Sequence, residues 1–151
     1  MKEVFIYDAI RSARTKAKPS GGLHELTPPE LLKPLYSALA SRNQLDPSRI
    51  AEIILGCVTQ HGEQAANIAK TSALYAGWPQ DIAGLTVHRF CSSSVDAIAL
   101  AGLKIAAGQS TAMVAGGIEM MSRVPMLSDH ARVFNDPDSV SYTHLTMPTT
   151  P

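Results

Sequence analysis

The chain has 151 residues, 45% of them hydrophobic, so it has the length of about one domain and can bury a substantial core. Its thirteen basic and thirteen acidic residues balance to a net charge of zero, which excludes the basic excess typical of nucleic-acid-binding proteins. The sequence shows no apolar run of membrane-spanning length and no secretory signal, so we expect a cytoplasmic protein without membrane or nucleic-acid partners. Its two cysteines lack the paired spacing of a metal site, and no metal is expected.

Strands and helices alternate along the first half of the sequence. Residues 4–7 are apolar and predict a first strand, followed by a loop rich in basic residues, Pro and Gly. A helix is predicted after Thr27, a favoured N-cap residue with Glu30 three positions on, and apolar residues follow at helical spacing (Leu31, Leu32, Leu35, Tyr36 and Leu39). The near-continuous apolar run at 50–58 predicts a strand covered on both faces, and residues 64–75 predict a second helix.

The second half repeats this alternation around a cysteine. Residues 85–87 predict a short buried strand, and a helix rich in Ala and Gly is predicted to follow Cys91 and to end at Gly108. The small side chains of this helix suit burial between other layers. Residues 112–115 predict a fourth strand that ends in two glycines. We therefore expect an α/β protein with a mainly parallel sheet and right-handed crossovers.

Cys91 lies where a strand is predicted to end and a helix to begin. Unpaired backbone N–H groups and the positive end of the helix dipole favour a thiolate at this position, and Arg89 adds positive charge nearby. Ser92 to Ser94 are residues that cap helices well. The alternative interpretation of Cys91 is that it packs in the core as a small buried hydrophobic residue. Cys57, within an apolar run that has no cap and no nearby cation, is predicted to pack inside a strand.

The other polar residues near the predicted site are expected to support the structure and not to take part in catalysis. His88 is expected to form a hydrogen bond near the site rather than to act as the base, because it lies on the same short strand as Cys91. Glu119 is expected to hold a turn in place, and the two glycines before it to allow either close backbone approach or a positive φ. The remaining histidines in predicted loops are expected to be solvated or locally hydrogen-bonded (His24, His61 and His130).

Several segments in order resemble one family, the thiolases, which form and cleave carbon–carbon bonds in acyl-coenzyme A thioesters. The opening Asp8-Ala9-Ile10-Arg11 is followed by Gly21-Gly22, and Leu55-Gly56-Cys57-Val58 leads towards Gln64 and Asn67. Two longer segments are more specific, and they are Val87-His88-Arg89-Phe90-Cys91 and Ala115-Gly116-Gly117-Ile118-Glu119-Met120-Met121-Ser122. The resemblance runs from about Val4 to about Pro125.

The resemblance implies a thiolase-like layered fold, with a buried helix after the nucleophile and Cys91 as the residue that carries the acyl group. The implied substrates are 3-ketoacyl-coenzyme A or acetyl-coenzyme A together with coenzyme A, with no cofactor beyond these. The family usually has Asn at the position of His88, and a small residue and Gly at those of Ser93 and Ser94. These departures are expected to mark a subfamily with a different acyl preference.

Thiolases bring a catalytic His in a Gly-His-Pro segment and a second Cys in a Cys-x-Gly segment, and neither segment occurs in this sequence. We therefore expect residues 1–138 to be a partial thiolase amino-terminal domain, inactive alone, from a parent enzyme that is a homodimer or homotetramer. Residues 139–151 are rich in Thr and Pro and resemble translated sequencing adaptor. They are expected to be an unrelated tail, either disordered or artefactual.

Two alternatives remain at this point. A β-ketoacyl synthase-like condensing enzyme would share the fold and would also place a Cys before a helix of small residues. Such proteins usually have that Cys later in the chain and lack the opening Arg11 and Gly21-Gly22. A non-catalytic remnant of the thiolase fold is the other alternative.

Overall fold

The computed structural model describes residues 2–129, and within them three parallel strands form one sheet. The strands are β1 (Glu52–Gly56), β2 (Ala83–Val87) and β3 (Met113–Gly117), in the order β2-β1-β3. In the shared register, Ile54 of β1 faces Leu85 of β2 and Ala115 of β3. The central position of β1 in the sheet explains why its buried residues Ile53 to Leu55 are apolar, and the predicted parallel α/β sheet is confirmed.

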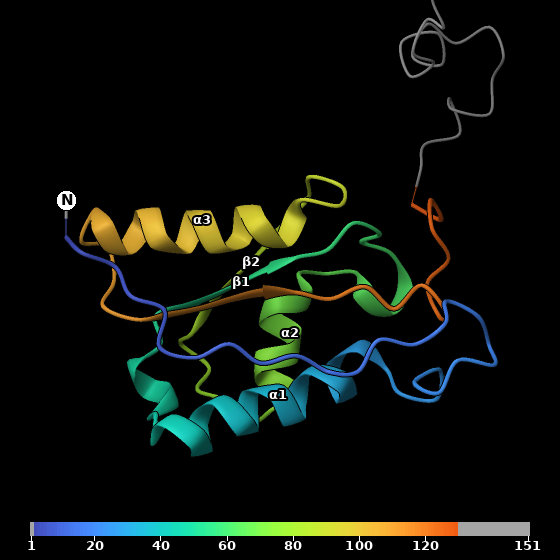
Figure 1. Ribbon diagram of the computed structural model, residues 1–151, viewed down its shortest axis with the longest axis horizontal. Coiled ribbons are helices and arrows are strands. Elements are labelled where there is room, and N and C mark those ends of the chain that lie inside the picture. The colour runs from blue at the N-terminus through green and yellow to red at the C-terminus, as the bar shows by residue number, and fades with distance from the viewer. Residues whose placement is uncertain (1, 130–151) are drawn as a thin grey trace, which may run out of the picture.

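Helices cover both faces of the sheet (Figure 1). Helices α1 (Pro28–Asn43) and α2 (Ile68–Tyr75) lie below the sheet in this view, and α3 (Ser93–Ala106) lies above it. Alternate residues of β1 point to opposite faces, so Ile53 joins a core with α1 and α2 while Ile54 packs on α3. The larger core includes Leu32, Tyr36, Leu55, Ile68 and Trp78.

Two helices begin as their N-terminal residues dictate. In α1 the backbone N–H and the hydroxyl of Thr27 both donate to Glu30 Oε2 at 2.7 Å, so the predicted pairing of these residues is confirmed. Helix α2 begins at Ile68 rather than at the predicted residue 64. The separate 3-10 helix η2 (Gly62–Gln64) precedes it, and Asn67 then turns the chain in the left-handed conformation, with φ 61°.

The predicted first strand at residues 4–7 is wrong. No strand in the described part of the chain pairs with this segment, and its side chains are open to solvent, with Phe5 at 66% and Tyr7 at 90% exposure. The chain is held on either side instead. Lys2 N–H donates to Ala106 C=O at 3.1 Å, and Asp8 forms an ion pair with Arg42 at 3.0 Å. An apolar sequence becomes a strand only where another strand offers its backbone groups.

Helix α3 buries the face that lies on the sheet. Ala97 is 0% and Ala101 6% exposed there, so their small side chains let the helix lie close to β1 and β3. On the opposite face, Val95 is 65% and Leu103 62% exposed among the described residues. None of the helices in residues 2–129 is long and apolar enough to cross a membrane. The tail predicted at 139–151, the boundary at 138 and His130 all lie outside the described residues.

Candidate active site

A sharp turn between β2 and α3 presents Cys91, which is exposed. Phe90 adopts the left-handed conformation, with φ 47°, which is rare for an aromatic residue. Buried Ser93 holds this turn, since its hydroxyl accepts from Arg89 N–H at 2.8 Å and donates to Phe90 C=O at 2.6 Å. Ser92 is the N-cap of α3 but makes no capping bond through its side chain. The turn is therefore stabilised by the second serine of the run.

Two glycines allow the start of α3 to approach the sheet closely. A Cβ atom at Gly56, the last residue of β1, would overlap the backbone of Ser93 and Ser94. A Cβ atom at Gly117, the last residue of β3, would overlap the Ser94 hydroxyl and lie 2.9 Å from Gly56 O. The predicted role of the glycines in close approach is confirmed at Gly117. Cys91 thereby comes to lie at the carboxyl ends of the parallel strands, where ligands bind in such sheets.

Cys91 lines a mostly apolar cavity of about 440 Å³ at this edge of the sheet. The residues after β1 form one part of its wall and those after β3 another. These two parts include Cys57, Val58, Thr59, Ile118, Glu119 and Met121. A cavity of this size, with a free thiol at its edge, is suited to the reacting end of an apolar acyl group.

The second cysteine lies in the same wall but in a different environment. Cys57 is 1% exposed, and Gln64 Nε2 lies 3.4 Å from its Sγ atom. Burial first, and then the negative charges of Glu119 and Asp129, raise the pKa of the Cys57 thiol to about 12. The thiol therefore stays protonated at neutral pH. The predicted burial of Cys57 is confirmed, but the residue directly follows β1 instead of lying inside the strand. Cys91 is the candidate nucleophile.

Arg89 and His88, both close to Cys91 in sequence, make other contacts than those predicted for them. Arg89 forms an ion pair with Asp96 of α3 at 2.6 Å, so its positive charge is balanced by that carboxylate. His88 follows β2 instead of lying within it, and its exposed ring packs edge-on against Phe90 at 4.8 Å between centroids. The predicted hydrogen bond of His88 is absent from the described residues.

Glu119 ties down a turn, as predicted. Its carboxylate accepts from the backbone N–H groups of Val58 at 2.8 Å and Thr59 at 3.3 Å, and from Gln64 Nε2 at 2.9 Å. Gln64 Oε1 in turn accepts from Met120 N–H at 2.5 Å. The role of Gln64 was not predictable from the sequence, because a polar residue at the start of a predicted helix gives no sign that it is fully buried.

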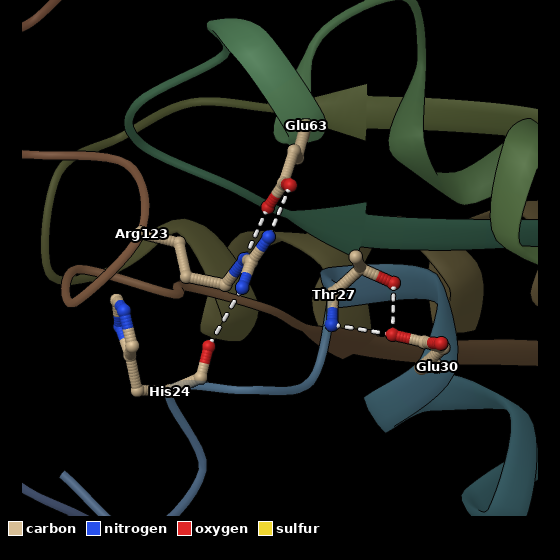
Figure 2. A network of polar contacts seen from close by, with 5 residues as sticks. All are labelled: His24, Thr27, Glu30, Glu63 and Arg123. Carbon is tan, nitrogen blue, oxygen red and sulfur yellow. Dashed lines mark hydrogen bonds and ion pairs between the residues drawn. The ribbon is translucent and has the colours of Figure 1, made fainter. Parts of the chain in front are cut away.

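A second polar network joins the same segments nearer to solvent. Arg123 donates through two nitrogens to Glu63, both at 2.5 Å, and through a third to His24 C=O at 2.8 Å (Figure 2). The hydrogen bond from Arg123 lowers the pKa of Glu63, as expected for a paired carboxylate. His24 differs from expectation, since its buried Nδ1 atom has no hydrogen-bond partner in the described part of the chain. His61 is exposed, as predicted.

Comparison with known proteins agrees with this geometry. The family model described as thiolase, N-terminal domain, matches residues 4–149. A steroid 3-ketoacyl-CoA thiolase of Mycobacterium tuberculosis is 38% identical over 85% of this chain and 31% of its own. A 3-ketoacyl-CoA thiolase of Acinetobacter baumannii is 40% identical over 83% of this chain and 32% of its own.

A solved structure is similar as well. The acetyl-CoA acetyltransferase of Bacillus anthracis aligns with a TM-score of 0.65 and 41% identity, covering 70% of this chain and 26% of that protein. The chain spans about a third of the length of the curated relatives it matches. Because the family model matches most of the sequence, the chain belongs to the thiolase family and corresponds to its amino-terminal part.

Proposed function

We propose that Cys91 is the nucleophile of a thiolase-type acyl transfer between 3-ketoacyl-CoA, acetyl-CoA and CoA. The observation that carries this proposal is the position of the Cys91 thiol. It is exposed at an apolar cavity, directly before α3 and at the carboxyl ends of the strands, in a chain of the thiolase family. The names of the relatives, 3-ketoacyl-CoA thiolase and acetyl-CoA acetyltransferase, supply the substrate class.

In the degradative direction the Cys91 thiolate adds to the 3-keto carbonyl carbon. The bond between C2 and C3 then breaks, its electron pair forms the enolate of acetyl-CoA, and C2 takes up a proton. The thiol of CoA loses its proton and attacks the acyl group on Cys91, which releases the Cys91 thiolate and a shortened acyl-CoA. The synthetic direction runs through the same steps in reverse.

The described residues supply only part of this chemistry. The N–H groups of Ser92 and Ser93 donate to carbonyl groups of the turn, so the dipole of α3 is the feature that favours negative charge beside Cys91. The Cys91 N–H is the proposed donor for an oxyanion. The other titratable side chains that line the cavity are Cys57 and Glu119. Cys57 is held protonated and the Glu119 carboxylate is engaged by three donors. The proposal therefore places the general acid and base outside residues 2–129, and the chain alone carries out no full turnover.

The test separates acylation from turnover. The purified chain is incubated with acetyl-CoA, and acetyl groups on each cysteine are located by peptide mass spectrometry. We expect acetylation of Cys91 in the parent chain and in Cys57→Ala, and none in Cys91→Ala. Absence of acetylation at Cys91, with the fold intact, would overturn the assignment of the nucleophile.

Turnover is measured separately as thiolysis of acetoacetyl-CoA by CoA. We expect the parent chain to match Cys91→Ala in this assay. Turnover that depends on Cys91 would show that the chain contains its own acid and base, and would contradict that part of the proposal. In the parent enzyme, which we propose to be a homodimer or homotetramer, the same cysteine substitution abolishes the reaction.

A further inference from the structure

Two neighbouring residues of η2 reach the segment that follows β3. Glu63 pairs with Arg123 at the surface, and Gln64 bonds to Glu119 and to Met120 N–H in the interior. The Arg123 and Glu63 side chains are 24% and 39% exposed, whereas Gln64 is 0% exposed. One contact is therefore screened by water and the other is not.

The interior contact pairs buried polar groups from three segments of the chain. Gln64 Nε2 donates to Thr59 C=O at 2.8 Å as well as to Glu119, and the Glu119 carboxylate also receives the N–H groups of Val58 and Thr59. Loss of either side chain leaves buried donors or acceptors without partners. Such a loss costs far more than removal of an exposed ion pair.

The backbone that this contact holds is also the wall of the Cys91 cavity. Cys57, Val58 and Thr59 line it from the β1 side, and Glu119 and its neighbours line it from the β3 side. We propose that Gln64 and Glu119 are a pair of positioning residues that fixes this wall relative to the Cys91 thiol. The Glu63–Arg123 ion pair does not have this role. The importance of the wall for acyl transfer rests on the proposed function, but the positioning itself does not.

Cys57 provides a reporter of the wall, because it is buried there and is the only other cysteine in the sequence. In a Cys91→Ala background, we expect Glu119→Gln and Gln64→Met each to speed alkylation of Cys57 by iodoacetamide. The expected increase is about tenfold to a hundredfold, the range that corresponds to one buried polar group left unpaired. Glu63→Gln is the matched control on the adjacent residue and should leave the rate within about threefold of the parent value.

Amide hydrogen exchange distinguishes local positioning from general stability. We expect the amides of Val58 and Thr59 to be protected in the parent chain and to lose protection in Glu119→Gln, while amides inside α1 keep theirs. Equal loss of protection in α1, or an unchanged rate at Cys57 in both interior variants, would overturn the proposal. If the variants do not fold, amide exchange in the parent chain still tests the proposed contact. Exchange of Val58 and Thr59 as fast as that of Tyr7, which is 90% exposed, would contradict the proposed contact.

A third measurement connects the pair to chemistry. In a Cys57→Ala background, we expect Glu119→Gln to slow acetylation of Cys91 by acetyl-CoA more than it changes alkylation of the same thiol by iodoacetamide. Equal changes in the two rates would contradict a positioning role. If the parent chain is not acetylated at all, the proposed function fails, while the Cys57 and amide measurements still decide whether the pair fixes the wall.

Discussion

The two cysteines show how local environment sets the chemistry of one side chain. Cys57 and Cys91 line the same cavity, yet one is buried beside two carboxylates and the other is exposed at the start of a helix. Burial and nearby negative charge both disfavour a thiolate, while the N-terminus of a helix favours one. Because both residues are free thiols, the proposed nucleophile differs from Cys57 in its position and not in its residue type.

The high pKa of Cys57 predicts a loss of stability at alkaline pH. The thiol titrates near 9 when it is unperturbed and at about 12 in the folded chain, so between these values the unfolded state binds fewer protons. The contribution is complete below pH 9 and disappears as the pH rises to about 12. We expect the unfolding free energy of Cys57→Ala to fall less steeply with pH across this window. The difference in slope should correspond to up to about one bound proton, and urea denaturation at a series of pH values measures it. Identical slopes in the two proteins would contradict the assignment.

The close approach of α3 to the sheet predicts opposite effects for two glycine substitutions. A Cβ atom at Gly56 would overlap backbone of the α3 start, which cannot rotate away, so Gly56→Ala should destabilise the chain by about 1–3 kcal/mol or more. Gly102 lies inside α3 with nothing within 4 Å of an added Cβ. Gly102→Ala should therefore stabilise the chain by about 0.5–1 kcal/mol. Thermal denaturation of both variants checks the difference in sign.

At the scale of elements, the turn before α3 is controlled by one serine. Ser93→Ala removes the acceptor of Arg89 N–H and the donor to Phe90 C=O in a turn where Phe90 is already strained. We expect a cost of about 1–3 kcal/mol in the unfolding free energy. Ser92→Ala is the matched control, because the Ser92 side chain makes no capping bond, and it should change stability by less than about 0.5 kcal/mol. Equal effects of the two substitutions would contradict this description of the turn.

The elements that could be predicted from sequence are those whose pattern reflects their own burial. The apolar run at 50–58 contains β1, whose Ile53 and Ile54 are both fully buried, on opposite faces of the sheet. Residues 4–7 have a similar apolar composition but form no strand in the described chain. The apolar pattern of residues 4–7 shows that this segment is suited to a β-strand. Whether it forms one depends on a neighbouring strand, which no local pattern specifies.

The candidate site divides in the same way. The motif around Cys91 could be located from sequence, because a strand end, a cysteine and a helix start lie within a few adjacent residues. The support beneath it could not be predicted, since Gln64 and Glu119 are 55 positions apart and meet only in the folded chain. Ser93 was recognised as part of a capping run. Its hydrogen bonds backwards to the turn depend on the unusual conformation of Phe90.

At the scale of the whole molecule, apolar side chains remain exposed on α3 and in the N-terminal segment. On α3, Val95, Ile98 and Leu103 are 65%, 48% and 62% exposed, and Ile6 in the N-terminal segment is 79% exposed. Exposed apolar side chains of this size promote association in water. The described chain therefore has a strong core around β1 together with an outer face of α3 that favours contact with other molecules.

This exposed face predicts that the isolated chain self-associates. Replacing Val95 by Glu and Leu103 by Lys should reduce association, because both positions are open to solvent and each new charge complements the helix dipole at its own end of α3. The pair adds no net charge. Gln80→Glu with Gln109→Lys is the control, since it makes the same change in charge at exposed polar positions. Light scattering after size-exclusion chromatography measures the result. Association that both double variants reduce equally would be electrostatic in origin, and a parent chain that elutes as a single monomeric species would contradict the prediction.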